Sequence, residues 1–247
     1  MPSGCGPLET DCELQPRLRD ALLLALTAAA GSTDAVSFLA LGRVFTANMT
    51  GNLVLLGIAI GQGQLAGSVR SVIALAGFVV GVTIGVRLTA GTDGPAVWPV
   101  SVTVALLVEL GLLAAFLAGW EVAGDHPAAL TLDALVALSA GAMGMQAAGA
   151  RRLQVSGVTT VFVTGMLTSL IADLATVGPG RSHWRLWATS LICLVIGAGA
   201  GAALFIAWRP GAPLVAVLLV GAVVAVASLP SREVPVRPSV NSISART

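Results

Sequence analysis

Long apolar runs alternate along the chain with short breaks rich in polar residues, glycine and proline. A helix needs about 20 mainly apolar residues to cross the roughly 30 Å hydrocarbon layer of a bilayer. Runs near this length predict eight membrane segments, and the second of them is short and opens with polar residues. The predicted segments are 20–42, 45–62, 69–90, 97–119, 129–150, 158–177, 185–208 and 212–229.

Composition places these segments in a membrane rather than in a soluble core. Of the 247 residues, 56% are hydrophobic and only 10% are charged, and the mean hydropathy is +0.91. A soluble domain carries about 25% charged residues, so this chain cannot cover a water-facing surface. We expect an all-α polytopic helical bundle of about six to eight membrane segments. One transmembrane domain, 19–229, is expected between polar tails at 1–18 and 230–247.

Two blocks of polar residues interrupt the apolar sequence at matching positions, Gly31–Asn52 and Gly144–Ser169. Polar groups are costly in hydrocarbon, so their repetition predicts a binding site. Asp34, deep in the first segment, is the first candidate for a substrate, cation or proton site. The alternative is an acid tied into a helix-packing network, with Arg43 or Asn48 as its partner.

The rest of the first block offers Asn48 and Asn52, which share a helix face, and Thr50 on another face. These residues could begin a half-helix whose free N–H groups attract an anion, or they could hydrogen-bond to neighbouring helices. In the second block, Gln146 takes roughly the place of Asp34. The predicted site lies between the two halves and is lined by Asp34, Asn48, Thr50, Asn52, Gln146, Thr164 and Thr168.

Glu109 is a second acid inside an apolar segment, ten residues after Pro99. A lone buried carboxyl group is neutral or faces water, so Glu109 is a candidate proton carrier beside Asp34. A protonated structural glutamate, or an ion pair with Arg87 of the preceding segment, is the alternative.

The two halves, 19–120 and 128–229, read as a tandem repeat. Thr50-Gly51 recurs 114 residues later, and Pro99 recurs at Pro213. Four spans per half give a parallel repeat, which we favour; a second segment that enters and leaves on one side would give an inverted one. Glycines at four-residue spacing predict close helix packing, against each other or in a homodimer. They are Gly77, Gly81, Gly85, Gly197 and Gly201.

The first polar block, with its runs DAVSFLALG and NMTGN, resembles the YoaK family of small bacterial multi-pass membrane proteins, classed as a domain of unknown function. The second block, with GMQ from Gly144 and TTVFVTGMLT from Thr159, is similar to that family's second block. The resemblance covers about residues 18–228. It implies a protein of the bacterial plasma (inner) membrane, and it carries neither a substrate nor a catalytic residue.

The function expected from these features is transport of a small solute or ion, with the lipid bilayer as surroundings. The alternative is a non-transporting membrane module for assembly, scaffolding or lipid contact. No enzyme motif, metal-ligand spacing or cofactor motif stands out, so we expect no enzyme, metal or cofactor. A net charge of +1 gives no basis for nucleic-acid binding. With eight spans, eight arginines against five favour cytoplasmic termini.

Overall fold

The computed structural model describes residues 7–90, 97–124, 127–153, 163–175 and 184–229. Eight α-helices occupy these ranges, one for each predicted segment, and their ends fall within a few residues of the prediction except at the start of α1. The C-terminal tail, predicted to be polar, lies outside the described residues. The helices are α1 Pro7–Ala40, α2 Met49–Gly61, α3 Leu65–Thr89, α4 Val100–Ala123, α5 Ala129–Arg152, α6 Val163–Ala175, α7 Trp184–Ala207 and α8 Leu214–Ala227.

Six of these helices are long and apolar enough to cross a membrane: α1, α3, α4, α5, α7, and α8 with the short turn before it. The other two, α2 and α6, have 13 residues each. At 1.5 Å per residue they reach about 20 Å, which is short of the roughly 30 Å hydrocarbon layer. The chain is therefore a polytopic helical membrane protein with two additional short helices.

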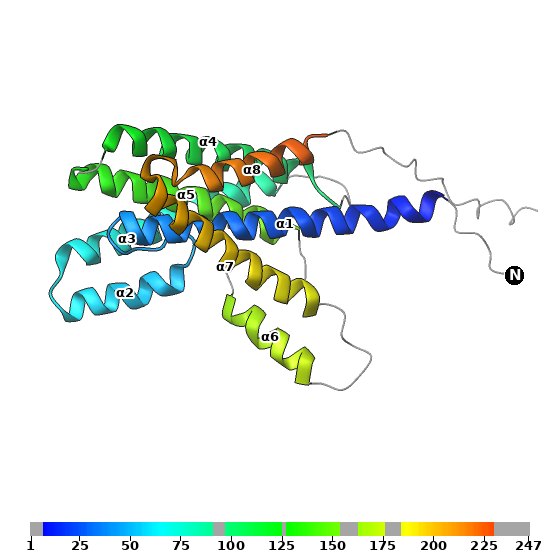
Figure 1. Ribbon diagram of the computed structural model, residues 1–247, viewed down its shortest axis with the longest axis horizontal. Helices are drawn as coiled ribbons and strands as arrows, with labels where there is room; N and C mark the ends of the chain where they lie inside the picture. The colour runs from blue at the N-terminus through cyan, green and yellow to red at the C-terminus, as the bar shows by residue number, and fades with distance from the viewer. Residues whose placement is uncertain (1–6, 91–96, 125–126, 154–162, 176–183, 230–247) are drawn as a thin grey trace, which may run out of the picture.

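The six long helices alternate in direction along one axis. In Figure 1, α1 runs from the N-terminus leftward, α3 returns, and α4, α5, α7 and α8 continue the alternation. The short helices lie toward opposite ends of the bundle, α2 beside α3 and α6 beside α7. Below, the end of the bundle at which α1 finishes is called the α1–α2 end, and the opposite one the N-terminal end.

Glycine contacts bring α3 onto α5 and α7 onto α1, rather than α3 onto α7. A Cβ atom at Gly81 would collide with the backbone of Gly141, and one at Gly85 would lie 2.6 Å from the Cβ of Ala148. In the other pair, a Cβ at Gly201 would lie 2.8 Å from the carbonyl oxygen of Ser32. These helix pairs therefore depend on the missing side chain, as small-residue packing in membranes does.

The outer helices and the core have different surroundings. Only 22% of the most apolar window of α3 and 17% of that of α7 is buried inside the protein, which leaves their outer faces to lipid.

Two clusters of buried side chains fill the interior. Trp120 belongs to one of these clusters, and its indole N–H donates to the carbonyl oxygen of Arg209 at 3.1 Å. Trp120 is thus packed in the core near the end of α4.

Gly81→Ala should destabilise the protein by about 1–3 kcal/mol, because the added methyl group meets the backbone of Gly141 and cannot be relieved by a side-chain rotation. Gly111→Ala in α4 is the matched control, since nothing lies within 4 Å of that position. Thermal unfolding of both variants in the same detergent checks this; equal midpoints would contradict it.

Candidate functional site

Asp34 holds the turn between α1 and α2. It lies in α1, six residues before the helix ends at Ala40. Its Oδ1 accepts the backbone N–H of Thr46 at 2.8 Å and that of Ala47 at 2.7 Å. Thr46 and Ala47 are buried, so these N–H groups could not be left to water. Arg43, one of the partners the sequence suggested, is exposed instead.

Asn52 holds the same turn from the other side. Its Oδ1 accepts the N–H of Phe45 at 2.9 Å, and its Nδ2 donates to the carbonyl oxygen of Phe45 at 2.5 Å. Both hydrogen-bonding groups of one residue's backbone are thus satisfied by one buried amide. The ring of Phe45 stacks on Phe38 of α1 with 5.0 Å between centroids. The turn is clamped between α1 and α2.

A third attachment joins the turn to α5. Ser139 donates its hydroxyl to Thr46 Oγ1 at 2.9 Å, and Thr46 Oγ1 donates to Ser37 Oγ at 3.4 Å. All three side chains are buried. Gly42, with φ +89°, makes the bend after α1 that a residue with a side chain would rarely adopt. The turn from Gly42 to Asn48 therefore closes over the α1–α2 end.

The remaining polar residues predicted on the short helices point elsewhere. Asn48 is exposed and caps α2, with its Oδ1 accepting the N–H of Gly51 at 3.2 Å. Thr50 is exposed as well. Thr164 and Thr168 are exposed on α6, where the Thr168 hydroxyl donates to the Thr164 carbonyl at 2.9 Å. Residues 154–162 of the second polar block lie outside the described residues.

Gln146 and Glu109 lie deep in the bundle. The Gln146 Nε2 donates to the carbonyl oxygen of Leu26 in α1 at 3.0 Å, while its Oε1 has no partner within the described ranges. Glu109 is fully buried, and neither carboxyl oxygen has a hydrogen-bond partner among the described residues. Arg87, the suggested ion-pair partner, is exposed near the end of α3. The structure thus joins Asp34 with Asn52 and does not gather the seven predicted residues in one place.

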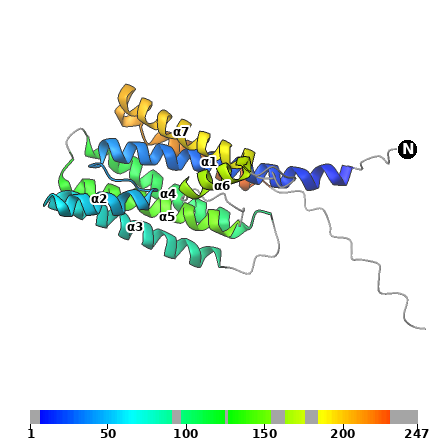
Figure 2. The ribbon, with the colours of Figure 1, turned by 90° about the horizontal axis from the view of Figure 1, so that it is seen from below.

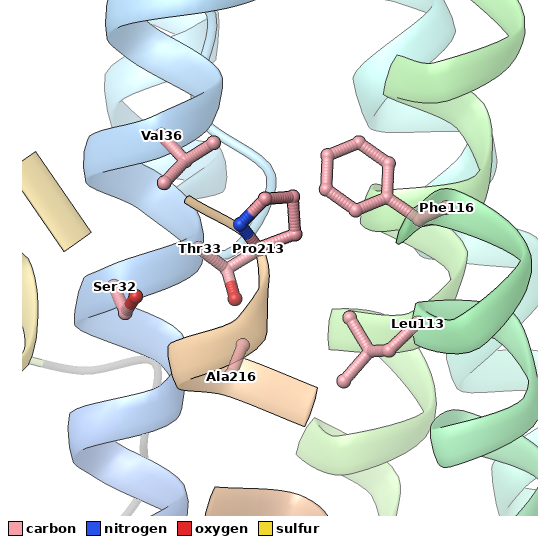
Figure 3. A pocket seen from close by; sticks show the side chains of 7 residues that line it. All are labelled: Ser32, Thr33, Val36, Leu113, Phe116, Pro213 and Ala216. Atoms are coloured by element: carbon pink, nitrogen blue, oxygen red, sulfur yellow. The ribbon is translucent and has the colours of Figure 1, made fainter. Parts of the chain in front are cut away.

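A cavity of about 10 Å³, room for about one water molecule, lies between α1, α4 and α8. Figure 3 shows Thr33 and Pro213 on one side of it and Leu113 and Phe116 on the other. Ser32 also lines it, and its buried hydroxyl oxygen has no partner in the described part of the chain. None of the seven residues predicted for the site lines this cavity.

The sequence did not single out three further buried polar residues, Thr46, Ser139 and Ser32. Ser139 could have been found, because it lies seven residues before Gln146 and so on the same face of α5. Within the described ranges no three His, Cys, Asp or Glu side chains come together as metal ligands.

Comparisons with known proteins agree with the membrane fold. The family model described as protein of unknown function (DUF1275) matches residues 22–226. The chain belongs to this family. It is also similar to the UPF0700 transmembrane protein YoaK of Bacillus subtilis (strain 168), with 46% identity over 98 residues. That match covers 40% of this chain and 43% of the relative's length. No solved structure matches the chain.

Asn52→Ala should cost about 2–4 kcal/mol of stability, because it leaves the N–H and carbonyl of the partly buried Phe45 without partners. Asn48→Ala, four residues earlier, removes only an exposed helix cap and should cost about 1 kcal/mol. Thermal unfolding in detergent compares the two. A smaller loss for Asn52→Ala than for Asn48→Ala would mean that the turn does not depend on this clamp.

Proposed function

We propose that this DUF1275-family protein is a secondary transporter of a small solute or ion in the bacterial plasma membrane, and that Glu109 carries a coupling proton. The observation behind the proposal is that Glu109 is fully buried without a hydrogen-bond partner for either oxygen in the described chain. Ionisable residues inside a membrane bundle are costly and are typical of ion pathways and proton relays.

A second side chain with an unpaired oxygen, Gln146, lies at the same depth. Contacts of Gly149 with Leu106 and of Gly141 with Leu112 show that α4 and α5 run antiparallel. This register places Glu109 level with residues 144–146 of α5, and therefore with Gln146. Two buried acceptors without donors at one depth are rare in folded proteins. A proton, a cation or a polar solute group bound between them would remove that cost.

The internal repeat is part of the proposal, and paired contacts support it. Gly31 of α1 meets Leu194 and Ala198 of α7, while Gly144 of α5 meets Phe78 and Val82 of α3. Gly31 and Gly144 are 113 residues apart, and each residue of the α7 pair is 116 residues from its counterpart in α3. Gly197 on Ala28 and Gly81 on Gly141 repeat both spacings. The α1–α7 and α3–α5 contacts are thus equivalent.

Three crossing helices per half make this repeat inverted rather than parallel. The first half supplies α1, α3 and α4 and the second α5, α7 and α8, so equivalent helices run in opposite directions (Figure 1). Inverted repeats with short, non-crossing helices are typical of secondary transporters. At the 113-residue spacing between equivalent positions of α1 and α5, Gln146 corresponds to Thr33, and Asp34 corresponds to Ala147. The sequence predicted that Gln146 corresponds to Asp34, which differs by one residue.

Six crossings also bear on orientation. Among the described arginines, six lie toward the N-terminal end and three toward the α1–α2 end. Arginine gathers on the cytoplasmic side, so we place both termini in the cytoplasm. The six are Arg17, Arg19, Arg87, Arg151, Arg152 and Arg185, and the three are Arg43, Arg70 and Arg209.

A non-transporting membrane module, alone or as a homodimer, is the alternative. The observation in its favour is the apolar face of α2, where Leu53, Val54 and Ile60 are exposed and no atom lies within 4 Å of where a Cβ at Gly57 would be. Lipid also covers such a face, so this observation weighs less than an unpaired buried carboxyl group.

Glu109→Gln should abolish proton-coupled transport while preserving side-chain volume. In proteoliposomes that enclose a pH-sensitive dye, gradients of alkali cations, amino acids, monosaccharides and carboxylates are imposed in turn. At least one gradient should change the internal pH with the unmodified protein and fail to do so with Glu109→Gln.

Glu121→Gln is the matched control, because Glu121 lies on the same helix and is exposed. It should transport like the unmodified protein. The proposal is lost if no gradient moves protons, or if Glu109→Gln is as active as Glu121→Gln.

The span count has its own test. In a background without Cys5, Cys12 and Cys193, single cysteines are introduced by Gln62→Cys, Ala128→Cys and Ala90→Cys. With six spans and cytoplasmic termini, a membrane-impermeant maleimide added to cells should label positions 62 and 128 but not 90. Eight spans would reverse all three results.

A further inference from the structure

One end of the bundle is closed by the turn between α1 and α2. Val44 of this turn and Leu41, the residue just before it, are fully buried in one apolar cluster with Phe116 and Trp120 of α4. Arg209, in the α7–α8 connection, places its guanidinium over the Trp120 ring at 5.3 Å and accepts the Trp120 N–H through its carbonyl. The apolar side chains of Leu41 and Val44, called the plug below, therefore cover the α1–α2 end beside the Arg209–Trp120 contact.

The unpaired Glu109 lies beneath this plug along one face of α4. Trp120, Phe116, Leu113 and Glu109 follow one another at helical spacing, and all four are buried. At 1.5 Å per residue, Glu109 lies about 16 Å below Trp120. The small cavity lined by Phe116 and Leu113 lies between them. A route along this face of α4 from the α1–α2 end to Glu109 would therefore pass the plug and then the cavity.

The plug is held to the rest of the bundle by few polar contacts. Asp34 binds the turn to α1, with a longer contact from Thr46 to Ser37, and Ser139 binds it to α5. The Asn52 contacts join the turn to α2 and would move with it. Since α2 packs chiefly on α3 and leaves much of its surface exposed, the turn and α2 form one unit, held by this packing on α3 and by those side chains of α1 and α5.

We infer that the turn Gly42–Asn48, together with α2, is a gate over the route to Glu109, and that Asp34 and Ser139 are its latch. The inference rests on the proposed transport function, whose site it regulates. In the structure the gate is shut: the latch bonds are formed, the plug is buried, and the cavity has room for only about one water molecule. Asp34 and Ser139 are positioning residues here, because they act through the turn rather than on a solute.

A thiol in the cavity reports whether the gate is open. In the cysteine-free background, Thr33→Cys places it at a buried lining position with little change in volume. The rate of its reaction with a charged maleimide is measured on purified protein in detergent. Asp34→Asn with Ser139→Ala should raise this rate about tenfold or more, because fewer and weaker contacts hold the closed state. Each single change should give an intermediate rate.

Ser190→Ala is the matched control for Ser139→Ala. Ser190 is equally buried, but its hydroxyl donates only to the Leu186 carbonyl within its own helix, at 2.8 Å. Labelling of the reporter should be unchanged. Circular dichroism selects folded variants, and Ser139→Ala alone decides the case if the double variant does not fold. Equal labelling rates in Ser139→Ala and Ser190→Ala would overturn the gate.

The labelling assay tests the gate and the flux assay tests the transporter, so either hypothesis can be contradicted without the other. Labelling reports access to the cavity whether or not a solute moves. Faster labelling in the latch variants without any Glu109-dependent flux supports the gate and removes the transporter. Glu109-dependent flux with unchanged labelling supports the transporter and removes the gate.

Discussion

The buried backbone at the turn between α1 and α2 is the constraint on which this structure depends. Water cannot satisfy peptide groups inside an apolar bundle, so each must find a partner in the protein. Asp34 supplies an acceptor for two N–H groups, and Asn52 supplies both a donor and an acceptor for Phe45. With these groups satisfied, α1 can end inside the protein, and α2 can begin without crossing the bilayer.

The same constraint separates two kinds of buried polar residue. Asp34, Asn52 and Thr46 are expensive in isolation, but their partners are present, so their presence is explained by the fold. Glu109 and the Oε1 of Gln146 have no such partners in the described chain. The fold gains nothing from an unpaired buried carboxyl group, which is why the proposed function rests on Glu109 rather than on Asp34.

Sequence predicted the elements well and their relations poorly. All eight helices were expected near their observed positions, because hydropathy over about 20 residues is a local property. The number of membrane-spanning helices was predicted only as six to eight, because it depends on the direction that α3 takes after the short α2. The glycine pattern indicated close packing, but the choice of α5 and α1 as partners is a tertiary property.

For the candidate site, too, the sequence predicted the residues better than their partners. Intramembrane polarity singled out Asp34, Asn52, Gln146 and Glu109, all of which lie in or beside the buried polar interior. Their partners could not be predicted. A carboxylate in sequence suggests a cation such as Arg43, whereas the structure satisfies Asp34 with the N–H groups of Thr46 and Ala47. Bonds from a side chain to the backbone of a turn depend on the path of that turn, which leaves no residue pattern.

Under the proposed inverted repeat, the difference between the halves becomes informative. Equivalent helices place Ala147 where the first half has Asp34, so the second half cannot hold its own connection with the same carboxylate. The helix contacts of the two halves are then equivalent, but the bonds that Asp34 makes at the α1–α2 end have no counterpart at position 147. Under the proposed function, a latch at Asp34 would control only the α1–α2 end, and alternating access to a central site requires that the two ends open at different times.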